Sequence, residues 1–175
     1  MMVINEMSFP NIEPEKLFEF MHNLETRMKY DIHRVQQPKL LAKGEDWQAI
    51  YYISAKPNVP MVAQREMLVK NYTVRNFQKE GQHLSVNCTV SHPDHPKKTG
   101  MFDYVRMSMH IEGSLVKPNP NGKGSIVQEY RHMDLEGSFP SFTVPTLASK
   151  FTSGYQKEWS RQLGLYLAGE LDHLL

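Results

Sequence analysis

The sequence is poor in cysteine, in long apolar runs and in net charge, and each shortage excludes a class of protein. Cys88 is the single cysteine among 175 residues, so an internal disulfide is impossible and a reducing, cytoplasmic compartment fits. No stretch approaches the ~20 apolar residues of a membrane span, and residues 1–10 are too short and broken for a signal peptide. The 20 basic residues nearly cancel the 19 acidic ones, which argues against a polybasic nucleic-acid binder.

The sequence also lacks the usual catalytic and metal-binding motifs. Its eight histidines include no His-Glu-x-x-His spacing, and His92 and His95 flank a short loop segment, so we expect no metal site. No glycine-rich phosphate loop follows a strand, and no nucleophile elbow is present. We therefore assign no catalytic residue and no cofactor, and we do not expect an enzyme.

Hydrophobic periodicity predicts one domain over residues 1–175, with a short strand and helical segment first. Residues 2–9 suit a strand, and Pro14 suits the first position of a helix. Apolar residues then recur at intervals of three and four, which predicts one helix or two short ones. They are Leu17, Phe18, Met21, Leu24 and Met28.

From His33 to Leu135 the pattern changes to the alternation typical of strands, in six segments separated by turn-forming sequences. The sequence PNPNGKG at 118–124 is the clearest hairpin signal among these turns. We therefore predict an antiparallel meander of six strands. The segments are IHRVQQPKLL, DWQAIYYISA, AQREMLVKNYTV, HLSVNCTVSH, DYVRMSMHIEGSLV and GSIVQEYRHMDL.

After Pro145 the spacing of apolar residues becomes helical again. A helix over the remaining ~29 residues would be roughly 43 Å long at 1.5 Å per residue, enough to cross a whole sheet. Alternation indicates one dry sheet face for it to cover. We assign to that face Leu84, Val86, Cys88, Val90, Val105, Met107, Met109 and Ile111, and to the wet face Ser85, Asn87, Thr89, Arg106, Ser108, His110 and Glu112.

A short motif, D-x-x-G-x-x-P, lies between the last predicted strand and the final helix. Asp134 can accept backbone N–H groups, Gly137 allows a positive φ, and Pro140 ends strand pairing. We expect all three to shape a bend and to touch no ligand.

This corner before a long C-terminal helix resembles the end of a START (steroidogenic acute regulatory-related lipid transfer) domain. Other segments resemble the same family in the same order, from about residue 3 to residue 174. They are KLFEFMHNLETRMKYD with Tyr30-Asp31, PNVPMVAQREMLVKN with Arg65-Glu66, and VSHPDHPKKTGMFDYVRMSMHIEGSLVKP. The resemblance implies an α+β helix-grip fold, also known from birch-pollen-allergen-like proteins. Its order would be β-α-α-β6-α, with a long C-terminal helix across the concave face of a curved antiparallel sheet.

The chain departs from the family by lacking the usual first helix and two strands. A bare sheet edge would follow, which favours pairing into a homodimer. The resemblance also implies an internal cavity that holds a lipid, sterol or other hydrophobic ligand, for carriage or sensing between membranes. Transient membrane contact would involve a lid made of the final helix and residues 56–61.

Candidate ligand-binding residues come from the dry strand faces and the helix stripe. Arg106 is added because an arginine in the Val-Arg strand of relatives can meet a polar headgroup; alternation places it on the wet face unless a bulge reverses it. The set is Tyr52, Val86, Cys88, Arg106, Met107, Met109, Tyr130, Leu147, Phe151, Tyr155 and Trp159. Two other readings remain open: a non-catalytic protein-interaction or regulatory module with a filled core, and a small-substrate enzyme on the same scaffold.

Overall fold

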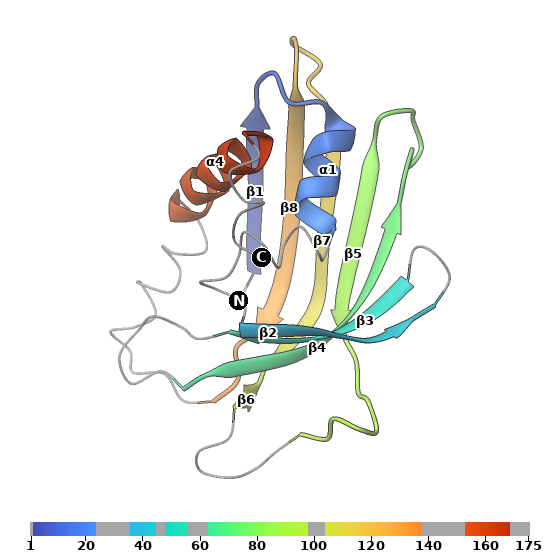
Figure 1. Cartoon of the computed structure of the whole chain (residues 1–175), viewed down its shortest axis with the longest axis vertical. Coiled ribbons are helices and arrows are strands. Elements are labelled where there is room, and N and C mark those ends of the chain that lie inside the picture. The colour runs from blue at the N-terminus through green and yellow to red at the C-terminus, as the bar shows by residue number, and fades with distance from the viewer. Residues whose placement is uncertain are drawn as a thin grey trace.

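The computed structural model of the chain describes residues 2–23, 36–44, 48–55, 63–97, 104–137 and 153–168 (Figure 1). In this part of the chain, neither helix has the length and hydropathy needed to cross a membrane. The elements are β1 (Met2–Phe9), α1 (Pro14–His22), β2 (Gln36–Lys43), β3 (Gln48–Ala55), β4 (Arg65–Val74), β5 (His83–Thr89), β6 (Val105–Arg106), β7 (Ser108–Pro118), β8 (Ser125–Asp134) and α4 (Ser153–Leu167).

The strands form one sheet in the order β1-β8-β7-β5-β4-β3-β2, and neighbours along it are antiparallel. The two-residue strand β6 pairs in parallel with the start of β4. Figure 1 shows β2, β3 and β4 running across the direction of β1, β8 and β7, so the sheet is strongly bent, and α1 and α4 lie on the same side of it. The predicted α+β class, the early strand and the antiparallel meander are confirmed.

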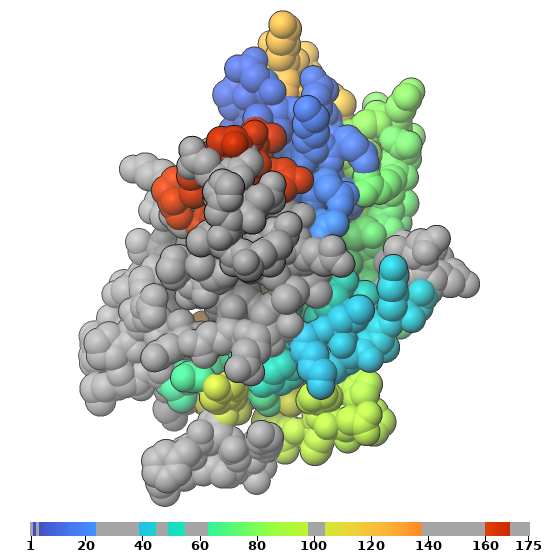
Figure 2. Space-filling view, viewed as in Figure 1, coloured from blue at the N-terminus to red at the C-terminus, as the bar shows by residue number. Residues whose placement is uncertain are grey.

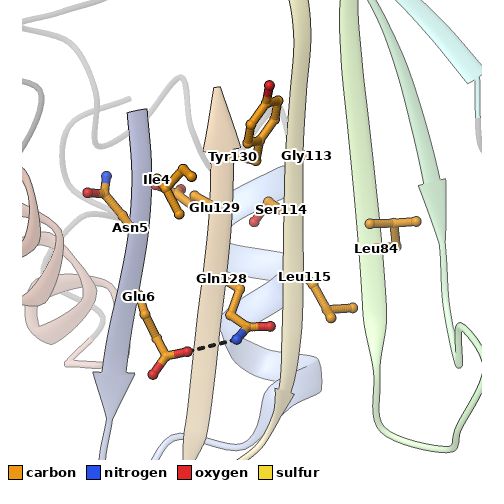
Figure 3. A pocket seen from close by; sticks show the side chains of 10 residues that line it. All are labelled: Ile4, Asn5, Glu6, Leu84, Gly113, Ser114, Leu115, Gln128, Glu129 and Tyr130. Atoms are coloured by element: carbon orange, nitrogen blue, oxygen red, sulfur yellow. Dashed lines mark hydrogen bonds between the residues drawn. The ribbon is translucent and has the colours of Figure 1, made fainter. Parts of the chain in front are cut away.

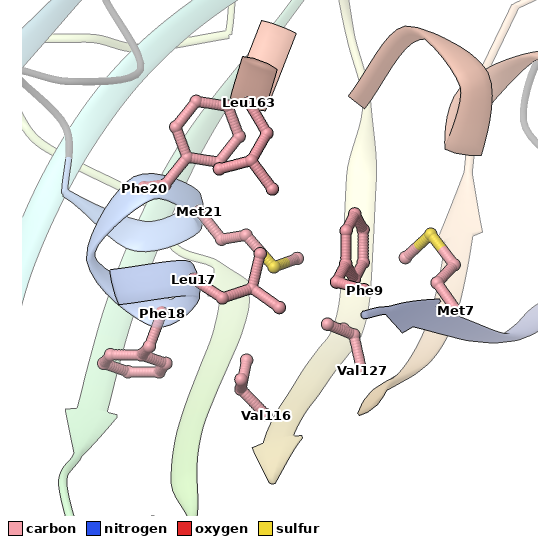
Figure 4. Packing of buried hydrophobic residues seen from close by; sticks show 9 residues of the cluster. All are labelled: Met7, Phe9, Leu17, Phe18, Phe20, Met21, Val116, Val127 and Leu163. Atoms are coloured by element: carbon pink, nitrogen blue, oxygen red, sulfur yellow. The ribbon is translucent and has the colours of Figure 1, made fainter. Parts of the chain in front are cut away.

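The core lies where α1 and α4 meet the sheet. Pro14 occupies the start of α1, where a missing N–H costs nothing, and the apolar stripe of the helix points at the sheet. Burial of one such large side chain stabilises the fold by roughly 1.5–3 kcal/mol. Figure 4 shows the cluster, which consists of Met7, Phe9, Leu17, Phe18, Phe20, Met21, Val116, Val127 and Leu163. Figure 2 shows α1 and α4 together at one end of the face of the sheet that they cover.

The corner after β8 is held by the side chain of Asp134 and by a buried arginine, Arg65. The Asp134 carboxylate accepts the N–H of Glu136 at 2.9 Å, and Gly137 has a φ of 73°. The guanidinium of Arg65 donates to the carbonyls of Leu135 and Glu136 at 3.1 and 3.3 Å. The predicted bend-forming roles of Asp134 and Gly137 are confirmed, while Pro140 lies outside the described residues.

The β7–β8 hairpin is locked against the end of β1 at Gly124. This residue has a φ of 91°, and its carbonyl accepts the Asn119 N–H at 3.0 Å. A Cβ added at Gly124 would lie 2.3 Å from the carbonyl oxygen of Phe9 and 2.6 Å from the nitrogen of Asn11. Only a glycine fits, because both the φ angle and the close backbone exclude a side chain.

We therefore expect Gly124→Ala to lower the free energy of unfolding by more than about 1 kcal/mol, since the new methyl group meets backbone that cannot turn aside. The matched control is Gly122→Ala in the same turn, where an added Cβ meets nothing within 4 Å. Chemical denaturation of both variants measures the difference. Equal stability of the two variants would contradict the assigned backbone contact.

Candidate functional site

The face of the sheet that α1 covers is unexpectedly polar. In β5 the buried residues include Ser85 and Asn87, while Leu84 and Val86 between them are only half-buried. The ring of Phe18 in α1 contacts that of His83, which shares the face of Ser85. The prediction that Ser85, Asn87 and Thr89 face water is therefore wrong. Alternation identifies two faces, but only the packing of α1 shows which one is inside.

A β-bulge in β7 changes which of its residues face inward. Met109 pairs with Met133, but Ile111 pairs with His132, so His110 is an extra residue on the β7 side. Met109 is buried and Ile111 is 41% exposed, so the prediction that they share the dry face is wrong. Beyond the bulge the inward positions include Glu112, which pairs with Arg131, so the prediction that Glu112 lies on the wet face is wrong.

Register brings the inward polar residues of four strands into rows. Asn71 of β4 pairs with Asn87 of β5, Asn87 pairs with Glu112 of β7, and Glu112 pairs with Arg131 of β8. A second row lies two residues along each strand, where Ser85 pairs with Ser114 and Ser114 pairs with Glu129. We call these residues the polar belt: Asn71, Ser85, Asn87, Glu112, Ser114, Glu129 and Arg131.

The side chains of the polar belt are bonded to one another. Asn71 Nδ2 donates to Asn87 Oδ1 at 2.6 Å and to Ser85 Oγ at 3.0 Å. Asn87 Nδ2 donates to Glu112 Oε2 at 2.8 Å, and Arg131 Nε donates to Glu112 Oε1. The result is a continuous hydrogen-bonded chain across four strands.

The charged end of the belt is deeply buried. Arg131 is 8% exposed and Glu129 is 4% exposed, and Arg131 Nη2 donates to Glu129 Oε1 at 3.2 Å. His22, the last residue of α1, lies 3.3 Å from the Ser114 hydroxyl through its Nε2 atom. The belt therefore reaches from the first helix to the middle of the sheet.

Apolar residues border the polar belt on both sides. Toward α1 lie Val116 and Val127 of the core cluster, which pair with each other. In the opposite direction lie Met109 and Met133, also paired and buried. Tyr51 of β3 shares this inner face through its pairing with Val69, and burial raises the pKa of its hydroxyl. Such a surface suits a molecule with a polar end and an apolar body.

The described residues contain no group of three or more His, Cys, Asp or Glu side chains placed to hold a metal ion. The carboxylates of Glu112 and Glu129 are instead engaged by Arg131, one on Nε and one on Nη2.

The predicted ligand-binding residues fall on both faces of the sheet. Met109 faces inward and is buried beside Met133. Val86 and Cys88 point to the opposite face, because they alternate with Ser85 and Asn87. Of the predicted strand residues, Met109 is the one placed beside the polar belt.

Tyr130 also lies on the outer face, where it is 39% exposed. It lines an open groove of about 340 Å³ on the side of the sheet opposite α1 (Figure 3). Glu6 and Gln128 form a hydrogen bond of 2.7 Å beside it. Apolar lining comes from Ile4, Leu84 and Leu115.

Tyr52 and Arg106 meet on the outer face at Glu66. The Tyr52 hydroxyl donates to one Glu66 carboxylate oxygen at 2.8 Å, and Arg106 Nη2 lies 2.7 Å from the other. Burial, followed by the bond to Glu66, raises the pKa of Tyr52 to about 12. The ring of His95 stacks on Tyr52, and the half-buried Met107 donates its N–H to the Glu66 carbonyl. This cluster fastens the loop at 91–97 to the sheet.

The remaining predictions lie beyond what the structure describes. Leu147 and Phe151 are outside the described residues, and so is the expected lid loop at 56–61. Tyr155 and Trp159 belong to α4, but their side chains are not described. Their roles stay predictions.

The position of α1 over the inner face is fixed by a clasp to the β4–β5 hairpin. Arg75 pairs with Glu15 and, at 2.7 Å, with Glu19, both on α1, and its guanidinium lies over the Phe18 ring. His83 Nδ1 accepts the backbone N–H of the hairpin residue Asn76 at 3.4 Å.

Burial, together with the nearby charge of Arg75, lowers the pKa of the His83 imidazole below its ordinary value of 6.5. Glu15 lies 3.0 Å from Nε2 and favours the proton, but its side chain is more than half exposed, so water screens the attraction. The neutral ring is therefore the form that folding prefers. His83 stabilises the fold fully above pH 6.5, and this stability is lost as the pH falls from there through the lowered pKa.

The sequence identifies the family of this domain. A family model described as the START domain matches residues 7–168. The chain belongs to the START domain family. No curated protein matches it. The resemblance seen in the sequence motifs is thereby confirmed.

Solved structures share the fold of this START domain. Human STARD10 is 20% identical with a TM-score of 0.81. The match covers 99% of this chain and 67% of the STARD10 chain. Human StAR-related lipid transfer protein 5 is 20% identical with a TM-score of 0.73, and the match covers 93% of this chain and 73% of that protein's chain. A STAR-related lipid transfer protein from Xanthomonas axonopodis is 16% identical with a TM-score of 0.66, and the match covers 92% of this chain and 85% of the Xanthomonas chain. The predicted helix-grip fold is confirmed.

Sequence reasoning missed the polar belt, although one signal for it was present. The hairpin at PNPNGKG pairs Pro118 with Ser125, and counting back from that pair places Glu112 opposite Arg131. Opposite charges directly across two strands are a recognised stabilising pair. The hairpin does not show on which face of the sheet Glu112 and Arg131 lie. That face is known only once α1 is placed.

The lowered pKa of His83 gives a test of the α1 clasp. We expect the free energy of unfolding to fall on acidification from pH 7 to pH 5, because protonation must overcome burial and the charge of Arg75. In His83→Gln this fall should be shallower, and in the control His92→Gln, a substitution in the 91–97 loop, it should match the wild type. Urea titrations at several pH values measure it. Identical slopes in wild type and His83→Gln would contradict the assignment.

Proposed function

We propose that this START domain, acting as a single domain over residues 1–175, binds a lipid, sterol or similar hydrophobic molecule on its inner face. The polar end of the ligand lies at the polar belt and its apolar body lies along neighbouring apolar residues such as Met109 and Met133. The observation that carries the proposal is a buried hydrogen-bonded row with apolar side chains on both sides. The two lipid transfer proteins compared above share the fold.

The energetic cost of the polar belt supports this proposal. Removing Glu112, Glu129 and Arg131 from water costs several kcal/mol per ion, and their mutual attraction offsets this only in part. Well-packed apolar residues in the same places are often as stabilising or more so. Polar groups kept on the face that α1 covers are therefore better explained by recognition than by stability.

The apolar part of such a ligand supplies the affinity. Each CH₂ group removed from water contributes about 0.8 kcal/mol, so a 16-carbon chain contributes on the order of 12 kcal/mol. A barrier of similar size opposes release into water. We therefore propose that exchange takes place in transient contact with a membrane, as expected for a cytoplasmic carrier or sensor.

The role proposed here is non-catalytic, and the charged groups of the belt bond to one another. A second candidate is an interaction module with a filled core. The cluster in which Leu17 and Met21 pack against Phe9 favours it, because side chains fill that end of the inner face. Pairing of two chains through β1, which ends the sheet order, would extend either role to a homodimer.

Lipid uptake by two tryptophan variants tests the ligand site. Met109→Trp places a large ring beside the polar belt, so we expect uptake from liposomes to fall at least about tenfold as apolar contacts are displaced. Val86→Trp makes the equivalent change on the outer face and should leave uptake within about twofold. Native mass spectrometry after incubation with liposomes measures bound lipid as an added few hundred daltons.

The wild-type protein is the reference for both variants. A clean mass with no added lipid, before and after incubation, would support the filled-core module. Equal uptake by Met109→Trp and Val86→Trp would show that the ligand binds elsewhere. Circular dichroism confirms that each variant is folded before the comparison is made.

A further inference from the structure

We propose that the polar belt selects ligands whose polar end is electrically neutral, with a hydroxyl or amide head, over ligands with a phosphate or carboxylate head. The inference rests on the proposed function and specifies its ligand class. It follows from how the charges of the belt are already paired.

The cation of the polar belt is engaged by carboxylates on two sides. Arg131 Nε donates to Glu112, and Arg131 Nη2 donates to Glu129 at 3.2 Å. A guanidinium is the usual partner of phosphate and carboxylate groups because its N–H fork matches two oxygens. Here two of its five N–H groups are directed at the protein's own carboxylates, so an arriving anion would compete with both of them for one cation.

Replacement of a carboxylate is unfavourable in this position. Glu112 accepts from Arg131 through Oε1 and from Asn87 through Oε2, so moving it breaks two bonds at once. Glu129 is 4% exposed, so water could not replace the hydrogen bond that its carboxylate would lose. An anionic head would also lie close to both carboxylates, and like charges repel strongly where water is scarce.

A neutral head meets a different set of groups. The Ser85 hydroxyl accepts from Asn71, and the Ser114 hydroxyl lies 3.3 Å from His22. A hydroxyl has one donor and two acceptor sites, and its O–H rotates to suit a partner. Asn71 uses its amide nitrogen within the belt, and its carbonyl oxygen is a further acceptor. These groups match a ligand hydroxyl or amide without disturbing an ion pair.

A pair of lipids with identical acyl chains isolates the head. Phosphatidylcholine vesicles carry either dioleoylglycerol or dioleoylphosphatidic acid at equal mole fraction, and native mass spectrometry with lipid extraction measures what the wild-type protein takes up. We expect dioleoylglycerol to exceed dioleoylphosphatidic acid by at least about tenfold, since an anionic head leaves a buried carboxylate without its partner.

Glutamine substitutions should reverse this selectivity. Glu112→Gln with Glu129→Gln keeps the shape of the belt and removes the two negative charges beside Arg131, so an anionic head is no longer repelled there. Uptake of dioleoylphosphatidic acid should rise at least about tenfold relative to dioleoylglycerol. The matched control is Glu6→Gln on the outer face, where Glu6 bonds Gln128; selectivity there should not change. If the double variant fails to fold, Glu129→Gln alone keeps the Asn87–Glu112–Arg131 chain and should shift selectivity in the same direction.

The outcomes separate the two proposals. Wild-type protein that takes up dioleoylphosphatidic acid or carrier phosphatidylcholine as readily as dioleoylglycerol binds lipid, but overturns the neutral-head inference. Wild-type protein that takes up no lipid of any kind removes the proposed function and the inference with it. Reversal in the double variant but not in Glu6→Gln supports both.

Discussion

The row from Asn71 through Asn87 and Glu112 to Arg131 depends on the register of four strands. Side chains alternate between the two faces of a strand, so a slip of one residue would move every member to the other face. Backbone restraints oppose such a slip: Gly124 lies against the carbonyl of Phe9 at the hairpin end. Buried charges meet their partners because the ends of the strands are fixed.

The inner face divides the tasks of stability and recognition between neighbouring rows. The cluster around Leu17 and Phe20 is fully buried and apolar, which is where most of the favourable burial energy arises. The polar belt adds little to that energy after desolvation. Under the proposed function, the cluster supplies stability and the belt is shaped by its ligand, which accounts for the local rule of sheet patterning that is broken there. Such breaks are expected at functional sites.

The sequence predicts the elements better than the faces. The start of α1 at Pro14 and the β7–β8 hairpin follow from local chemistry, and both were predicted correctly. Alternation predicts the inner face of β5 in reverse. Both faces of this strand are partly covered, and alternation alone does not show which face is buried. The pairing of Arg106 with Glu66 needs the parallel contact of β6 with β4, which depends on distant segments and has no local signature.

Internal pairing of the belt charges also bears on how a carrier works while empty. If the arginine of a site were paired only by a ligand anion, it would be an uncompensated buried charge in the unloaded protein. Such a charge would destabilise the fold. In this domain Glu112 and Glu129 compensate Arg131 without a ligand. Under the proposed function, loading adds apolar burial and neutral hydrogen bonds to a structure whose ion pairs are already formed. Affinity would come from the ligand's apolar body and selectivity from its head, so release does not require a buried ion pair to be broken.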